Sequence, residues 1–120
     1  MDRELWKGEM TQTSPMKWSG PFELFLRYDS ESSPPQALDG LTIWPTLGEA
    51  KVKIEGTWKS DNDFEFKETR CVSGDCSQVI VGGSYQASID SKKQIISGTA
   101  VGPMGLKGIF SAKRFRPTTD

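Results

Sequence analysis

The chain has 120 residues, with 15 Lys or Arg, 16 Asp or Glu and no His. Its length corresponds to one domain, and a formal net charge of −1 argues against nucleic-acid or membrane-surface binding driven by bulk charge. The sequence has no apolar run long enough to span a membrane and no apolar signal core at residues 1–6. We therefore expect a soluble, cytoplasmic protein.

Short runs that alternate between apolar and polar residues recur along almost the whole chain. The clearest lie at 22–28, 51–58 and 63–67. Period two is typical of β-strands with one buried and one solvated face. In chain order, we predict strands near 4–13, 22–29, 38–44, 50–58, 63–72, 76–81, 84–90, 94–101 and 105–115.

Turn-forming residues separate these strands, and one longer, polar and proline-rich loop lies at 29–36. A spacing of roughly 8–12 residues between strands is typical of an up-and-down barrel or a sandwich. Glycines inside strands, such as Gly56 and Gly98, favour the barrel, because closing a small barrel requires kinks. We predict an all-β domain over 1–116, a small antiparallel up-and-down β-barrel of eight or nine strands. A solvated tail follows at 117–120.

The two cysteines, Cys71 and Cys76, are separated by four residues. Two cysteines do not make a disulfide framework, so we favour reduced thiols. One alternative is a disulfide around the turn at 73–75. The other is a metal site, whose remaining ligands would have to be carboxylates because the chain has no His.

Strand parity places three charged residues in phase with the apolar interior: Glu68, Arg70 and Arg114. They could form an ion-lined barrel mouth that orients a polar group of a ligand or peptide, since binding pockets are mostly apolar with a few placed polar groups. Alternatively, each charge reaches water at a strand end and pairs with a neighbour. A bulge in the fifth strand would also turn these residues outward.

Bulky aromatic residues compete for the barrel interior, which in an eight-stranded barrel is just wide enough to be filled or to hold one small ligand. This crowding predicts a filled interior, with recognition at the mouth or on an outer face. Trp44, beside Pro45 in an irregular segment, could contact a partner or plug one barrel end. The predicted ligand- or partner-binding residues are Trp44, Trp58, Phe66, Glu68, Arg70, Tyr85 and Arg114.

The absence of His removes the commonest general base and would leave either cysteine without an imidazole partner as a nucleophile. Asp61 and Asp63 resemble part of a calcium loop, but the required Gly and Glu are out of place. We expect no enzymatic activity and no cofactor. Carboxylate-pair or serine chemistry is the remaining enzymatic alternative.

Two features resemble the calycin group of lipocalin- and avidin-like barrels. Trp6 opens the first strand and the last strand ends at 112–116, as lipocalins pack an early Trp against an Arg of the last strand. The lipocalin Gly two residues before this Trp is replaced by Glu4, and an avidin-like run, 56–58, lies in mid-chain rather than at the start. The resemblance implies a closed barrel with an internal or mouth site for a small molecule.

Residues 7–66 are also similar to the substrate-receptor barrel of the GID/CTLH ubiquitin ligase. The matching segments are 7–9, 22–29, 38–43, 45–47, the strand around Gly56, and Phe64. That family binds a peptide terminus at its barrel mouth. This chain is shorter, and its second half lacks the family's long insertions and helical segment. The resemblance implies a barrel that receives a polypeptide.

These observations favour a non-enzymatic binding barrel that recognises a protein or peptide at its mouth. The alternative is a calycin-like carrier or sensor of a small apolar molecule in the barrel interior. We expect no nucleic-acid or membrane partner. We expect a monomer or a weak dimer, because any strand edge left open could pair with the same edge of a second copy.

Overall fold

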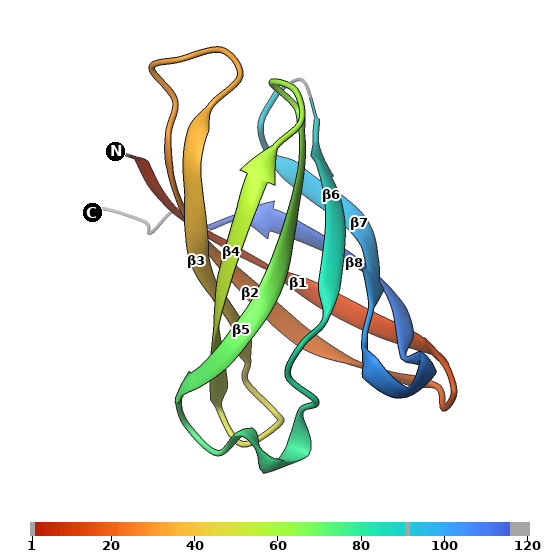
Figure 1. Ribbon diagram of the computed structural model, residues 1–120. Coiled ribbons are helices and arrows are strands. Elements are labelled where there is room, and N and C mark those ends of the chain that lie inside the picture. The colour runs from red at the N-terminus through yellow and green to blue at the C-terminus, as the bar shows by residue number, and fades with distance from the viewer. Residues whose placement is uncertain (1, 91, 116–120) are drawn as a thin grey trace, which may run out of the picture.

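The computed structural model describes residues 2–90 and 92–115, which form one closed β-barrel (Figure 1). Eight antiparallel strands pair in sequence order, and the last closes the barrel against the first. This confirms the predicted all-β, up-and-down architecture, and the predicted tail at 117–120 lies outside the described residues. The strands are β1 (Asp2–Ser14), β2 (Trp18–Asp29), β3 (Gln36–Trp44), β4 (Ala50–Trp58), β5 (Asp63–Ser73), β6 (Ser84–Ile89), β7 (Ile95–Val101) and β8 (Lys107–Arg114).

The predicted strand at 76–81 is wrong. Its place is taken by a short 3₁₀ helix, η1 (Cys76–Gln78), and an irregular segment that leads into β6. The Asp75 carboxylate accepts a hydrogen bond from the backbone N–H of Ser77 at 3.0 Å, which favours a helical turn at this point. A second 3₁₀ helix, η2 (Pro103–Gly105), lies between β7 and β8. No helix of the described chain is long and apolar enough to cross a membrane.

Alternate residues of the strands point into the barrel, as the period-two pattern predicts. On β2, every second residue from Phe22 to Tyr28 is buried. Aromatic rings pack against one another in the interior, where the ring centroids of Phe66 and Tyr85 are 4.6 Å apart. The buried apolar core comprises Trp6, Met10, Phe22, Leu24, Leu26, Tyr28, Leu38, Trp44, Ala50, Val52, Ile54, Phe64, Phe66, Tyr85, Ala87, Ile89, Ile96, Phe110 and Ala112.

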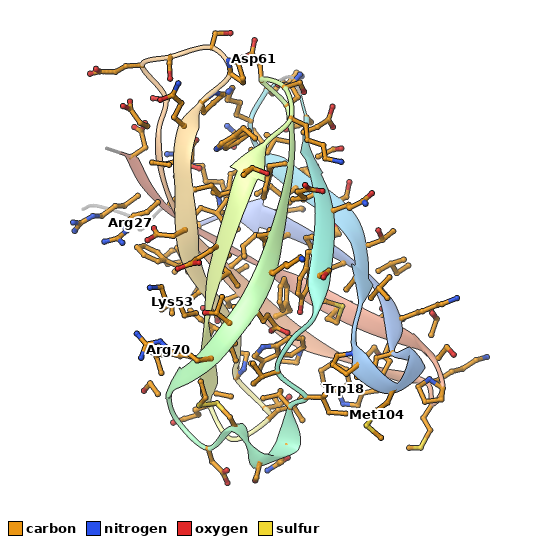
Figure 2. The ribbon with its side chains drawn as sticks, in the orientation of Figure 1. Trp18, Arg27, Lys53, Asp61, Arg70 and Met104 are labelled. Carbon is orange, nitrogen blue, oxygen red and sulfur yellow. A yellow bond between two sulfur atoms is a disulfide. The ribbon has the colours of Figure 1, made fainter. Side chains whose placement is uncertain are left out.

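The pairing of β4 with β5 has two register shifts, one between Lys51 and Val52 and one, a β-bulge, between Lys53 and Ile54. At the bulge, one step along β4 corresponds to two steps along β5, and Thr69 is the additional residue. Glu68, before the bulge, is buried, whereas Arg70 and Val72, after it, are exposed. The predicted interior orientation is therefore wrong for Arg70, and the stated alternative, an outward turn caused by a bulge in this strand, is the one that holds for it. Figure 2 shows Arg70 on the outside of the barrel, near Lys53.

Cys71 and Cys76 form a disulfide, with their Cα atoms 6.2 Å apart. The interpretation of both residues as reduced thiols is therefore wrong. The chain reverses direction between them at Gly74, which has a φ of +74°. A Cβ atom at this position would lie 2.2 Å from the backbone oxygen of Glu49, so only Gly fits there.

The two ends of the barrel are built from different connections (Figure 1). The cleft end consists of the β1–β2, β3–β4, β5–β6 and β7–β8 connections, at 15–17, 45–49, 74–83 and 102–106. The network end includes the start of β1, the end of β8 and the connections at 30–35 and 59–62. Each end contains one buried carboxylate, Glu68 and Glu4 respectively.

Candidate functional site

A cleft of about 270 Å³ opens at the cleft end of the barrel. Its walls come from β1, β2, β3, β5, β6, β7 and β8 and from the 45–49, 74–83 and 102–106 connections. Apolar side chains predominate, and the inward carboxylate of Glu68 is the one acidic group among the lining residues. The lining residues are Met10, Gln12, Trp18, Trp44, Leu47, Glu68, Gln78, Val79, Ile80, Gly83, Tyr85, Ala100, Val101, Gly102, Leu106, Lys107 and Gly108.

The Glu68 carboxylate is fixed by neutral hydrogen-bond donors. The hydroxyl of Thr42 donates to Oε2 at 2.9 Å, and the backbone N–H of Gly83 donates to Oε1 at 3.0 Å. The indole Nε1 of Trp44 donates to Thr42 Oγ1 at 3.0 Å and so orients that hydroxyl. Glu68 is only 8% exposed, yet it forms no ion pair with any Lys or Arg in the described chain.

Burial sets the titration of this carboxylate. Removal from water raises the pKa of Glu68 above its ordinary value, and the hydrogen bonds from Thr42 and Gly83 offset part of that rise. The pKa of the neighbouring Tyr85 hydroxyl is also raised, first by burial and then by the charge of Glu68. The site is therefore a desolvated acidic group held in place without a compensating cation.

Two tryptophans form an aromatic wall of the cleft. The ring centroids of Trp44 and Trp18 are 6.3 Å apart, and Trp44 also packs edge-on against Phe22, at 5.1 Å. Trp44 ends β3 and is 8% exposed, whereas Trp18 begins β2 and is half-buried. The arrangement gives the cleft one rigid, largely apolar side.

Exposed apolar side chains surround the cleft end. Met16 is 73% exposed and Met104 is 83% exposed, and they come from the β1–β2 and β7–β8 connections. Ile80, from the 74–83 connection, is exposed and lines the cleft. Figure 2 shows both Met104 and Trp18 at this end of the barrel. We call Met16, Ile80 and Met104 the apolar rim.

The network end holds its carboxylate differently. Glu4 Oε2 accepts a hydrogen bond from the Tyr28 hydroxyl at 2.9 Å and forms an ion pair with Arg114 at 3.2 Å. Glu4 Oε1 accepts from the Trp6 indole at 3.3 Å. Burial and the Glu4 carboxylate raise the pKa of Tyr28. Both oxygens of Glu4 are thus occupied, and its charge is balanced.

The structure separates the residues that sequence patterns grouped as one site. Trp44, Glu68 and Tyr85 line the cleft. Phe66 lies beneath Tyr85 in the core and is absent from the cleft lining. Arg70 is on the outer surface.

The other two predicted residues lie at the network end. Arg114 pairs with Glu4, and Trp58 packs between the rings of Tyr28 and Phe64, at 5.0 and 4.8 Å. The three predicted charges therefore do not share one mouth.

Three important residues were not predicted from the sequence. Thr42 and Glu4 each lie two positions before a buried Trp, on the same strand face. The period-two pattern could therefore have predicted that both side chains point into the barrel. Trp18 lies four residues before the predicted second strand, and no pattern in the sequence places it in a cleft. No cluster of three or more potential metal-ligating His, Cys, Asp or Glu residues occurs within 2–90 and 92–115.

No known protein family and no curated protein sequence matches this chain.

Proposed function

We propose that this protein is a non-enzymatic binding barrel whose cleft receives the amino terminus of a polypeptide. The observation that carries the proposal is the Glu68 carboxylate, which is buried in a largely apolar cleft and forms no ion pair with any residue of 2–90 and 92–115, although Lys107 also lines the cleft. Its role is to accept a charge-assisted hydrogen bond from the ligand's ammonium group.

The electrostatics of the cleft favour a cationic ligand group. A buried carboxylate is costly unless an opposite charge or several hydrogen bonds compensate it. Thr42 and Gly83 supply two neutral hydrogen bonds, which hold the carboxylate in position before a ligand arrives. An ammonium group would add the missing charge, and N–H to carboxylate bonds with both partners ionised are among the strongest hydrogen bonds in proteins.

The size of the cleft and the apolar rim favour a polypeptide over a free small molecule. Pockets for drug-sized ligands typically have volumes of about 300–1,000 Å³, and the cleft, at about 270 Å³, has room for a chain end. Met16, Ile80 and Met104 lie outside it and could contact the residues that follow that end. Flexible Met side chains suit such contacts because they adapt to varied surfaces.

The two family resemblances support related proposals. The likeness to the ubiquitin-ligase substrate receptor implies recognition of a peptide terminus at the mouth. A distant calycin-like relationship is supported by the direct opposition of Trp6 and Arg114 in the β1–β8 pairing. The apolar cleft wall formed by Trp18 and Trp44 keeps a carrier or sensor of a small apolar molecule as the alternative function.

A peptide library tests the proposal directly. Short peptides with free amino termini and randomised first residues are incubated with the immobilised protein, beside the same library after N-acetylation, and the bound peptides are identified by mass spectrometry. We expect retention from the free library only, because acetylation removes the positive charge. The affinity of the best peptide is then measured by calorimetry.

Glu68→Gln keeps the size of the side chain and removes its charge. It should weaken peptide binding by about 10- to 100-fold, the range for losing a hydrogen bond between charged groups. Glu65→Gln is the matched control, because Glu65 is on the same strand but pairs with Lys59 on the outside of the barrel. Equal retention of acetylated peptides, or undiminished affinity in Glu68→Gln, would refute the proposal. A small apolar compound that co-purifies, with no peptide retained, would favour the carrier.

A further inference from the structure

The disulfide lies at the start of one wall of the cleft. Cys71 is near the end of β5, and Cys76 begins η1. The chain then continues through Val79, Ile80 and Gly83, all of which line the cleft. The covalent bond therefore ties this wall to the body of the barrel at one end.

Few backbone hydrogen bonds hold the first part of the wall, although the side chains of Cys76, Val79 and Val81 pack against the hydrophobic core. The backbone N–H of Asp75 donates to the Gly48 carbonyl at 2.8 Å, and that of Val79 donates to the Cys76 carbonyl at 3.2 Å. No residue of η1 is buried. Ile80 and Val81 make no backbone hydrogen bond in the described chain. Segments with few backbone hydrogen bonds open at lower free-energy cost than the paired strands of a barrel do.

At its other end, the wall is connected to the binding carboxylate itself. The backbone N–H of Glu68 donates to the Gly83 carbonyl at 2.9 Å, and the N–H of Gly83 donates back to the Glu68 carboxylate at 3.0 Å. Movement of the wall would therefore change both the shape of the cleft and one of the hydrogen bonds that fix Glu68.

We propose that the Cys71–Cys76 disulfide is a redox switch for the cleft, an inference that rests on the proposed function of Glu68. A dithiol reductant transfers two electrons and two protons, the S–S bond breaks, both cysteines become thiols, and the reductant closes its own disulfide. Cys71 is exposed and Cys76 is partly exposed, so a reductant has access. From the sequence we expect a cytoplasmic protein, and in that reducing compartment disulfides are usually transient and catalytic or redox-sensing.

Reduction should act locally. The bridged cysteines are only five positions apart, and the stabilisation from a disulfide grows with the length of the loop that it closes. The eight strands and the β1–β8 closure are held by strand pairing, and only β5 carries one of the two cysteines, near its end. The reduced protein should therefore remain a barrel with a loosened cleft wall and a lower affinity for its ligand.

Hydrogen exchange measured by mass spectrometry tests the switch without any ligand. On addition of dithiothreitol, the hydrogen-bonded amides of 76–83, which are those of Ser77, Val79 and Gly83, should exchange about tenfold faster because local opening becomes easier, while β1 to β4 remain protected. The double variant Cys71→Ser/Cys76→Ser should show the fast exchange without reductant and no response to it. Unchanged exchange at 76–83, or loss of protection throughout the barrel, would overturn the switch.

Affinity for the best free-amine peptide, measured with and without dithiothreitol, provides the second readout. We expect the reduced protein to bind about fivefold more weakly, because the cleft is less pre-organised. Equal affinity in both states would overturn the switch while leaving the proposed function intact. If no peptide binds in either state, the proposed function fails, and the exchange measurement still decides whether the disulfide controls the wall.

Discussion

The two ends of the barrel each bury one carboxylate, and the partners of these carboxylates differ. Glu4, at the network end, is 8% exposed and is compensated by the guanidinium of Arg114 as well as by two neutral donors. Glu68, at the cleft end, is equally buried but has only neutral donors. The comparison shows the same residue type ion-paired at one end of the barrel and held only by neutral donors of the described chain at the other.

The connections at the two ends differ in the same sense. At the network end, the segments 30–35 and 59–62 contain only Ser, Glu, Pro, Lys, Asp and Asn. At the cleft end, Met16, Ile80 and Met104 expose apolar surface. Since exposed apolar side chains that gather around a cleft mark interaction sites more often than scattered ones do, recognition is expected at the cleft end.

Trp44→Ala should produce the largest effect, a loss of about 3 kcal/mol in the free energy of unfolding, as expected for removing a buried Trp. The side chain is buried, packs against Phe22 and orients Thr42. Chemical denaturation followed by circular dichroism measures the loss. Trp44→Phe, which keeps most of the volume, should recover most of the stability. A fully stable Trp44→Ala that loses only binding would show that Trp44 is a contact residue rather than a plug.

Arg114→Ala tests whether the network end is structural. The substitution should lower the free energy of unfolding by about 2 kcal/mol, because it leaves the buried Glu4 carboxylate uncompensated, and the partial exposure of Arg114 limits the cost. Peptide binding should be unchanged, since the cleft is at the opposite end. Lys113→Ala, at the exposed neighbouring position on β8, is the control and should be nearly neutral. A selective loss of binding in Arg114→Ala would contradict the separation of the two ends.

The pH dependence of binding should sharpen the comparison further. Binding requires an ionised Glu68, whose pKa is raised by burial, and a protonated peptide amine, whose pKa is about 8. Affinity should therefore fall about tenfold per pH unit below the pKa of Glu68 and again above about pH 8. Calorimetry across this range measures both limbs. In Glu68→Gln the fall in affinity at low pH should disappear. If affinity still falls at low pH in this variant, another group is responsible for it.

The free protein should show the corresponding stability effect. The folded-state pKa of Glu68 lies above the unfolded value, so the folded state binds this proton more tightly. The contribution of Glu68 to stability therefore increases as the pH falls from the raised pKa towards the ordinary value of 4.5. The pKa of Asp63 is lowered, chiefly by its hydrogen bond from Ser88. Its contribution to stability is therefore lost as the pH falls below the ordinary value of 3.8. Comparing wild type with Glu68→Gln isolates the first contribution.

Period two was sufficient to predict most of the barrel, because each strand has one apolar and one polar face. Runs such as 22–28 and 51–58 specify which residues point inward, and the buried positions follow them. The failures occur where one local interaction overrides the pattern. The Asp75 cap turns the predicted strand at 76–81 into η1 and an irregular segment.

The candidate site was harder to predict because it depends on pairing between distant strands. Glu68, Thr42 and Gly83 come from different parts of the chain and meet only when β3 and β5 lie close in the closed barrel. Strand parity specified the face of Glu68 but not the barrel end at which it lies. It therefore grouped Glu68 with Arg114, which the closed barrel places at the opposite end.

Arg70→Ala should produce the smallest effect, and it tests how far the ligand site extends. The bulge at Thr69 places Arg70 on the outer surface, away from Glu68. We expect the free energy of unfolding to change by no more than about 0.5 kcal/mol, as is usual for exposed positions, and peptide affinity to stay at the wild-type value. Lys53→Ala, directly opposite on β4, is the matched control. A clear loss of affinity in Arg70→Ala alone would mean that the ligand passes over the edge of the barrel onto β5, and that a charged residue outside the barrel takes part in recognition.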